Sequence, residues 1–213
     1  MESIRIETVF YVLEGLVAAS FIGIIYYVWK QIRKNKHQRH AHKVVDALGV
    51  KYLRDVALPD GIDGLIFMDY LLLVPGGFVV VDTQHIAGHL FGGETVDQWS
   101  QVINNKTYKF NNPLYANQSA CQAVQWNLQH NAETENLPAD IPWQIQGWVT
   151  FSSAGNFPKG IPAQVSMIDE LKDKLSPLLN NEGADSAVVD EDLQHAWDVL
   201  QKISTATHAE NRH

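Results

Sequence analysis

Cysteine is nearly absent from this chain, because Cys121 is the only one among 213 residues. No disulfide can form within the chain, and a reducing compartment requires none. The sequence also lacks internal repeats and low-complexity segments, which argues against a solenoid and against a long disordered region. Its length suits one globular domain with short appended segments.

Basic residues are scarce in most of the chain. After residue 43, nine Lys and Arg stand against 21 Asp and Glu, which gives this part a net charge of −12. An enzyme that binds nucleic acid normally presents a basic stripe, because phosphate contacts dominate its affinity. The domain after residue 43 is therefore predicted to present a surface that repels polyanions.

One long apolar run lies near the N-terminus. The segment from Val9 to Trp29 matches the roughly 20 residues that a membrane-spanning helix needs, and Glu14 is its single charge. A cleaved signal peptide would begin with basic residues and end in small ones, whereas acidic residues precede this run and Trp29 ends it. The sequence predicts an uncleaved transmembrane anchor over residues 1–30, with residues 9–29 in the membrane.

A basic segment follows the anchor at residues 31–43. Together with Lys30 it holds the only dense group of positive charges in the chain: Lys30, Arg33, Lys34, Lys36, Arg39 and Lys43. By the positive-inside rule, this segment keeps the rest of the protein in the cytoplasm, and it can also contact lipid headgroups. The predicted location is the cell membrane, with a single pass and a cytoplasmic domain.

The domain predicted over residues 44–204 alternates helical and strand patterns, with a frayed tail at 205–213. The expected order is helix, three strands, helix, strand and two helices, which defines a mixed α/β fold. The glycine-containing stretch at 88–93 is expected to be a turn or bulge. The expected elements are a helix ending at Gly49, strands at 52–58, 69–74 and 78–84, a helix at 114–130, a strand at 143–151, and helices at 165–179 and 189–203.

Two apolar strands in the stretch "MDYLLLVPGGFVVVDTQ" (68–84) each carry a carboxylate far from their shared turn. If the loop is Gly76-Gly77, Asp69 lies opposite Gln84, and if it is Pro75-Gly76, Asp69 lies opposite Asp82. In both cases Asp69, Asp82 and Gln84 share one face, because side chains alternate along a strand. A three-residue loop would place Asp69 opposite Thr83 instead and separate the three side chains.

Two neighbouring carboxylates repel each other and are costly to bury, unless one is protonated or a cation joins them. Mg²⁺ is the cation that this pair fits, since it takes one or two carboxylates and completes its octahedron with water and phosphate. A second interpretation is that each aspartate faces solvent at a strand end.

The same segments resemble a known family. An Asp, an apolar hairpin and an acidic residue two positions before the site of a lysine form the pattern of the PD-(D/E)xK nucleases, and the surroundings resemble their nuclease-related domain (NERD) branch. The resemblance covers about residues 40–150 and implies a restriction-endonuclease-like mixed sheet flanked by helices. The matching stretches are "RDVALPDG", "MDYLLLVPGGFVVVDTQHIAGHLFGG", Trp99, "NNPLYANQ" and "VTFSSAGNFP".

The resemblance implies that Asp69 and Asp82 hold the metal, expected to be Mg²⁺, and that Gln84 takes the place of the lysine. The chain departs from the pattern because Asp82 replaces a glutamate and Gln84 brings no positive charge. The acidic residue of the first helix has no clear counterpart, and Asp46 is the nearest one.

Two functions follow from this resemblance. One is a metal-dependent phosphodiesterase that acts on DNA or RNA at the cytoplasmic face. The other is a catalytically weakened domain that serves as a membrane-tethered binding module for an unknown partner.

A further element of the family is matched by Asn112, Pro113 and Gln118, which correspond to its "NP…Q" pattern. These residues can also serve helix capping and packing.

Overall fold

The computed structural model describes residue 20 and residues 38–48, 50–138, 142–180 and 188–210. The chain divides into two units, Met1–Lys43 and Val44–His213. The predicted spanning segment at 9–29 lies outside the described residues except for Ser20. Within the described ranges, no helix is long and apolar enough to cross a membrane. All strands found among the described residues belong to the second unit.

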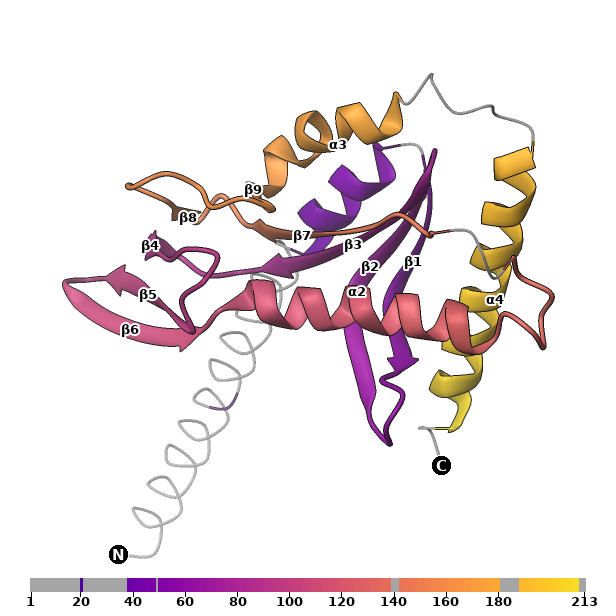
Figure 1. The fold of residues 1–213 in the computed structure, drawn as a ribbon. Coiled ribbons are helices and arrows are strands. Elements are labelled where there is room, and N and C mark those ends of the chain that lie inside the picture. The colour runs from indigo at the N-terminus through magenta and orange to yellow at the C-terminus, as the bar shows by residue number, and fades with distance from the viewer. Residues whose placement is uncertain (1–19, 21–37, 49, 139–141, 181–187, 211–213) are drawn as a thin grey trace, which may run out of the picture. The chain divides into compact units, whose positions relative to one another are not determined.

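The central sheet has five strands in the order β1-β2-β3-β7-β9 (Figure 1). Strands β1, β2 and β3 pair in antiparallel fashion, whereas β3, β7 and β9 run parallel. The apolar runs of β2 and β3 place them in the middle of the sheet, where both faces are covered. The strands are β1 (Lys51–Pro59), β2 (Leu65–Val74), β3 (Gly77–Gln84), β7 (Ile145–Phe151) and β9 (Val165–Met167).

The β2–β3 hairpin turns at Pro75-Gly76. Val74 pairs with Gly77, and the same register continues to the pair of Tyr70 and Val81. Gly76 adopts a φ of 94°, which only glycine takes readily, so this residue allows the tight turn. The loop is therefore the second of the two-residue alternatives, which places Asp69 opposite Asp82.

A second sheet of four strands, in the order β6-β5-β4-β8, was not anticipated from the sequence. The stretch at 88–93, predicted to be a turn or bulge, contains strand β4. Asn104 and Asn105 form the β5–β6 turn with φ values of 50° and 57°, a conformation that asparagine tolerates. The strands are β4 (Gly88–Phe91), β5 (Gln98–Ile103), β6 (Lys106–Asn111) and β8 (Gly155–Asn156).

Helices α2 (Pro113–His130) and α4 (Val188–Glu210) pack against one face of the central sheet. Asn112 caps α2, since its Oδ1 accepts a hydrogen bond from the Leu114 N–H at 3.0 Å, and Pro113 occupies the first turn. The expected capping role of Asn112 and Pro113 is thus confirmed. The core on this face includes the buried residues Leu71, Phe78, Val80, Ala120, Val124, Leu128, Ala196, Trp197 and Leu200.

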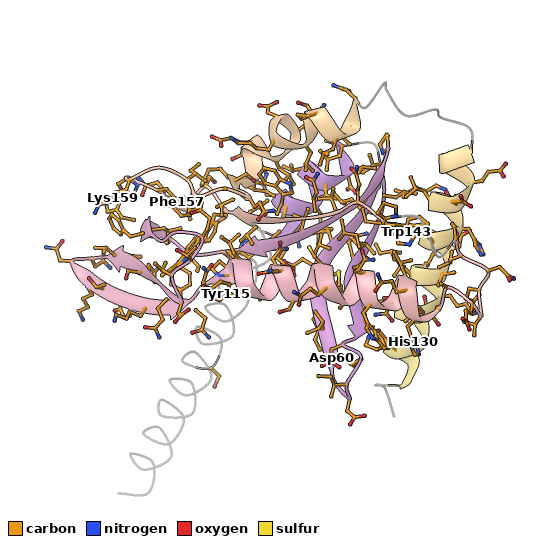
Figure 2. The ribbon with its side chains drawn as sticks, in the orientation of Figure 1. Asp60, Tyr115, His130, Trp143, Phe157 and Lys159 are labelled. Atoms are coloured by element: carbon orange, nitrogen blue, oxygen red, sulfur yellow. The ribbon has the colours of Figure 1, made fainter. Side chains whose placement is uncertain are left out.

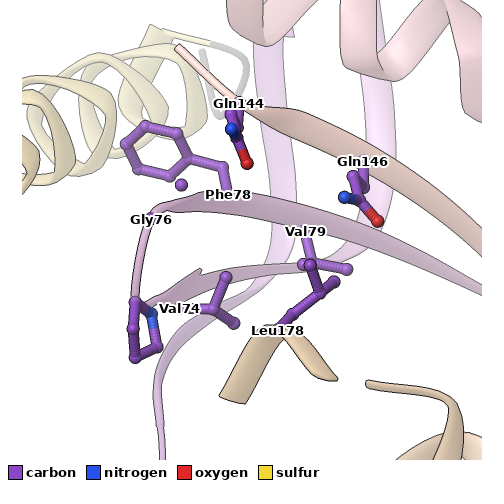
Figure 3. A pocket seen from close by; sticks show the side chains of 9 residues that line it. Val74, Gly76, Phe78, Val79, Gln144, Gln146 and Leu178 are labelled. Atoms are coloured by element: carbon purple, nitrogen blue, oxygen red, sulfur yellow. The ribbon is translucent and has the colours of Figure 1, made fainter. Parts of the chain in front are cut away.

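Helix α3 (Leu171–Leu179) lies on the opposite face. Its Leu178 lies beside Val79 at a small pocket of about 20 Å³ next to the hairpin turn (Figure 3). This volume holds about one water molecule, so the pocket is a packing gap and not a ligand site.

Two predictions about the C-terminal part are wrong. Residues 165–167, expected to begin a helix, form strand β9 because they pair with β7, and the single 3₁₀ turn Ile168–Glu170 then leads into α3. Helix α4 continues to Glu210, beyond the predicted start of the tail at residue 205. Ser204 and Thr207 are buried, so this last part of α4 has a packed face and is not frayed there.

Candidate functional site

The two aspartates lie where strands β2 and β3 separate. Strand β3 pairs with β2 only up to Val81, whereas its last three residues, Asp82 to Gln84, pair with β7. On the other side of this point, the first residues of β2 pair with β1 alone. Asp69 and Asp82 are therefore the first residues beyond the last β2–β3 pair, at a fork in the sheet.

Asp69 and Asp82 contact each other across this fork. The Asp69 N–H donates a hydrogen bond to Asp82 Oδ1 at 3.2 Å. Asp69 Oδ2 accepts hydrogen bonds from the Thr83 N–H at 2.7 Å and from the Thr83 hydroxyl. Both carboxylates thus take part in the main-chain pairing of the neighbouring strand, which fixes their positions.

Asp82 is also held by helix α2. Asn117 Nδ2 donates to Asp82 Oδ2 at 2.9 Å and lies 3.4 Å from the Val80 carbonyl oxygen. The Asn117 side chain is only 3% exposed. An asparagine in the middle of a helical pattern gave no signal in the sequence, because its partner lies 35 residues away.

Gly147 of β7 makes room for Asn117. A Cβ atom on Gly147 would lie 2.0 Å from Asn117 Oδ1 and 3.0 Å from Cys121 Sγ. Because real Cβ atoms do not approach so closely, any larger residue would push Asn117 away from Asp82. The absence of a side chain at this position is therefore part of the site.

Burial raises the pKa of the Asp82 carboxyl above its ordinary value, and the charge of Asp69 raises it further. The hydrogen bonds from Asn117 and from the Asp69 N–H act in the opposite direction. Burial also raises the pKa of the nearby Cys121 thiol to about 12, and the charge of Asp82 adds to this effect. Cys121 therefore stays protonated at neutral pH and is not a nucleophile.

Gln84 and Asp46 are the other two residues that the family resemblance pointed to. Gln84 follows Asp82 by two residues in β3, so its side chain is on the same face, and it is partly exposed. Asp46 accepts a hydrogen bond from the Tyr52 hydroxyl. The register of β1 and β2 places a further acid, Asp55, opposite Asp69, with a φ of 50°. Sequence reasoning missed Asp55, although it is part of the stretch "RDVALPDG".

The donor atoms fit a small hard cation. Carboxylate oxygens from Asp69 and Asp82 are the ligands that Mg²⁺ prefers, and two carboxylates suffice when water and phosphate complete the shell. Burial is the main cause of the raised pKa of Asp82 and the charge of Asp69 adds to it, and a bound cation would offset both effects. No group of three or more His, Cys, Asp or Glu within the described ranges is arranged to hold a metal ion. An ion here would depend on these two aspartates.

A cleft of about 340 Å³ lies beside Asn117, between α2 and β7. Its lining combines uncharged polar residues with apolar ones, and Glu94 is the only charged residue among them. Gln118, which matches the family's "NP…Q" element, lines this cleft. The lining residues are Glu94, Leu114, Tyr115, Asn117, Gln118, Cys121, Ile145, Gly147 and Gln164.

The described unit is a mixed α/β domain with a carboxylate pair at a sheet fork. Residues 29–152 match the family model of the nuclease-related domain (NERD). Since the match covers more than half of the chain, the protein belongs to the nuclease-related domain family.

An uncharacterised protein of Bacillus anthracis is 27% identical over 75 residues, which are 35% of this chain and 35% of that protein. The chain therefore matches about a third of that relative's length. No solved structure matches the chain.

Proposed function

We propose that the protein is a metal-dependent phosphodiesterase that acts on nucleic acid at the Asp69–Asp82 fork. The observation that carries this proposal is the direct contact between the two aspartates on adjacent strands, with Gln84 on the same face as Asp82. Asp69 and Asp82 would hold Mg²⁺. When bound, this ion polarises a phosphoryl oxygen and lowers the pKa of water.

The side chains around the ion would have distinct roles. Thr83 orients the Asp69 carboxylate through two hydrogen bonds, and Asn117 orients Asp82. Gln84 would hydrogen-bond the attacking water but supplies no charge to offset the negative charge that develops on the phosphate. We therefore expect slow hydrolysis.

The order of elements supports a restriction-endonuclease-like core. A helix at residues 38–46 precedes β1, β2 and β3, and α2 then leads to β7, which pairs in parallel with β3. This order agrees with the fold that the family resemblance implied.

The second candidate function is a catalytically weakened binding module. Gln84 in place of lysine favours it. The net charge of −12 after residue 43 also opposes binding of an extended polyanion.

Cleavage assays on the purified 213-residue chain distinguish these functions. With Mg²⁺ or Mn²⁺, the wild-type chain should cleave DNA or RNA slowly, and Gln84→Lys should increase the rate because an ammonium group stabilises the developing charge. A gain of about tenfold corresponds to about 1.4 kcal/mol of the barrier. Gln201→Lys, at an exposed position of α4, adds the same charge and should leave the rate unchanged.

If the wild-type chain and Gln84→Lys are folded but equally inactive on single- and double-stranded DNA and RNA, the phosphodiesterase proposal is wrong. The binding-module function would then be the better account.

We also propose that residues 9–29 anchor the domain to the cell membrane, with the basic segment at 31–43 on the cytoplasmic side. A reporter that works only in the cytoplasm should be active when fused after His213. Replacing the Lys and Arg of residues 30–43 by glutamine should reduce this orientation preference. Activity of an export-dependent reporter at the same position would refute the predicted topology.

A further inference from the structure

One edge of strand β7 is open along its first half. Strand β3 pairs with the whole of β7, whereas β9 pairs with it only from Val149 onward. Directly before β9, Gln164 adopts a φ of 57°, and the Val165 N–H donates to the Pro162 carbonyl oxygen at 3.3 Å. The chain therefore makes a tight turn here instead of running along β7. Among the described residues, no strand pairs with residues 145–147 on this side.

The main-chain groups of this open edge point outward. In a parallel sheet, the N–H and C=O of one residue face one neighbouring strand, and those of the next residue face the other. The Gln144 carbonyl oxygen accepts a hydrogen bond from a β3 N–H at 2.8 Å. The Val149 N–H donates to the Gln164 carbonyl oxygen at 2.9 Å, on the opposite side. The N–H and C=O groups of Ile145 and Gly147 therefore point away from β3.

These main-chain groups border the cleft of about 340 Å³, because Ile145 and Gly147 both line it. Its other wall is helix α2, which contributes Leu114, Tyr115 and Gln118. Tyr115 lies near the start of this helix and is 40% exposed (Figure 2). A strand edge thus faces a helix across an open space. An extended peptide can add a strand to such an edge, since its main chain bonds the edge and alternate side chains contact the helix.

The charge of the cleft selects the kind of peptide. Glu94 is exposed and is the only charged residue among those that line the cleft. The hydrogen bond that it accepts from the Ala163 N–H lowers the pKa of Glu94, so its carboxylate is ionised at neutral pH. A second acid, Asp97, lies 3.4 Å from the hydroxyl of Tyr115. A Lys or Arg side chain complements this charge, whereas a phosphate backbone is repelled by it.

We propose that the cleft binds an extended basic peptide of a partner protein as an additional strand beside residues 145–147 of β7. About three peptide residues, at roughly 3.3 Å each, would lie along this edge. A Lys or Arg of the peptide would pair with Glu94, and an apolar side chain would contact Leu114 and Cys121. This inference is independent of hydrolysis at the sheet fork, and it gives the binding-module function a class of partner.

The test begins with a phage-displayed library of random peptides, selected on the 213-residue chain. We expect sequences that combine Lys or Arg with β-branched or aromatic residues. Labelled copies of the selected peptides give affinities by fluorescence anisotropy. Ile145→Pro should weaken binding by about fivefold, because proline removes an N–H that points into the cleft and is not bonded to β3. Ile145→Val keeps this N–H and is the matched control.

Glu94→Gln tests the charge and does not depend on the folding of the proline variant. Glutamine keeps an oxygen that can accept the Ala163 N–H but loses the negative charge. Affinity for the selected peptides should therefore fall by about threefold. Glu133→Gln removes an equal charge from an exposed position outside the cleft and should leave the affinity unchanged.

Amide hydrogen exchange locates the bound peptide. Binding should slow exchange of the Gly147 amide, whose N–H points into the cleft, whereas the Gln146 amide faces β3 and should change little. The proposal is overturned if no peptide is selected, or if wild type, Ile145→Pro and Glu94→Gln bind the selected peptides equally. Displacement of the peptide by a single-stranded oligonucleotide would assign the cleft to nucleic acid and also overturn it. Because these assays contain no divalent metal, their outcome is independent of whether the chain cleaves.

Discussion

Asp69→Asn should abolish stabilisation by Mg²⁺ together with any cleavage. A metal that binds only the folded state stabilises it by about 2.7 kcal/mol at a concentration 100 times its dissociation constant. For a protein of this length, that corresponds to a rise in melting temperature of roughly 5–10 °C. Asparagine keeps one oxygen but loses the charge that attracts the ion. Thermal unfolding with and without Mg²⁺ or Mn²⁺ measures the effect.

Asp82→Asn should have the same effect, because the ion would require both carboxylates. Asp173→Asn is the matched control, since it removes an equal charge from an exposed position of α3. It should keep the full metal-dependent rise in melting temperature. An unchanged melting temperature of the wild type in both metals, or an equal rise in Asp69→Asn, would show that the fork is not a metal site.

Trp99→Ala should lower the free energy of unfolding by about 3–5 kcal/mol, as expected when a buried aromatic side chain is removed from a core. Trp99 is fully buried and stacks on Phe151 with ring centres 6.0 Å apart and an angle of 12° between the rings. It also contacts Phe110 and Phe157 edge to face. The melting temperature should fall by roughly 10 °C.

Tyr108→Ala is the control for this substitution. Tyr108 belongs to the neighbouring strand β6 but is 50% exposed, so its removal should cost less than about 1 kcal/mol. Chemical denaturation of the three proteins gives the comparison. Equal stability of Trp99→Ala and Tyr108→Ala would mean that the cluster around Trp99 does not hold the second sheet.

Trp99 also connects the two sheets. Its cluster joins β5 and β6 of the second sheet to β7 of the central sheet through Phe110 and Phe151. The position of the second sheet is therefore set by this packing. Loss of Trp99 should loosen this connection between the two sheets.

The register of the β2–β3 hairpin could not be predicted uniquely from the sequence. Two-residue loops at Pro75-Gly76 or at Gly76-Gly77 are both compatible with the stretch "VPGGF", and each brings Asp69 and Asp82 to one face. The structure selects Pro75-Gly76. A main-chain hydrogen bond outside the hairpin supports this register, because the Phe78 N–H donates to the carbonyl oxygen of Gln144, just before β7, at 2.8 Å. A residue 66 positions away thus helps to fix the turn.

The second sheet could not be predicted from the sequence either. Its strands have two to six residues, and Gly88, Gly92 and Gly93 occur in or beside β4. Such short segments have too few side chains to show a period of two clearly. Their partners are set by long-range pairing, such as that of Gly88 with Gly155. Asn117 was missed for the same reason, because only the folded chain brings it to Asp82.

The sequence by itself determined the first helix, strands β1 to β3, helix α2 and strand β7, the two aspartates on one hairpin, and membership of the nuclease-related domain family. These features depend on hydrophobic periodicity and on local motifs, which neighbouring residues specify. Only the tertiary structure decided which residues face Asp69, that Asn117 and Gly147 shape the environment of Asp82, and that a second sheet packs beside the site. Each of these depends on contacts between residues distant in sequence, whose energies are set by packing and burial and not by local pattern.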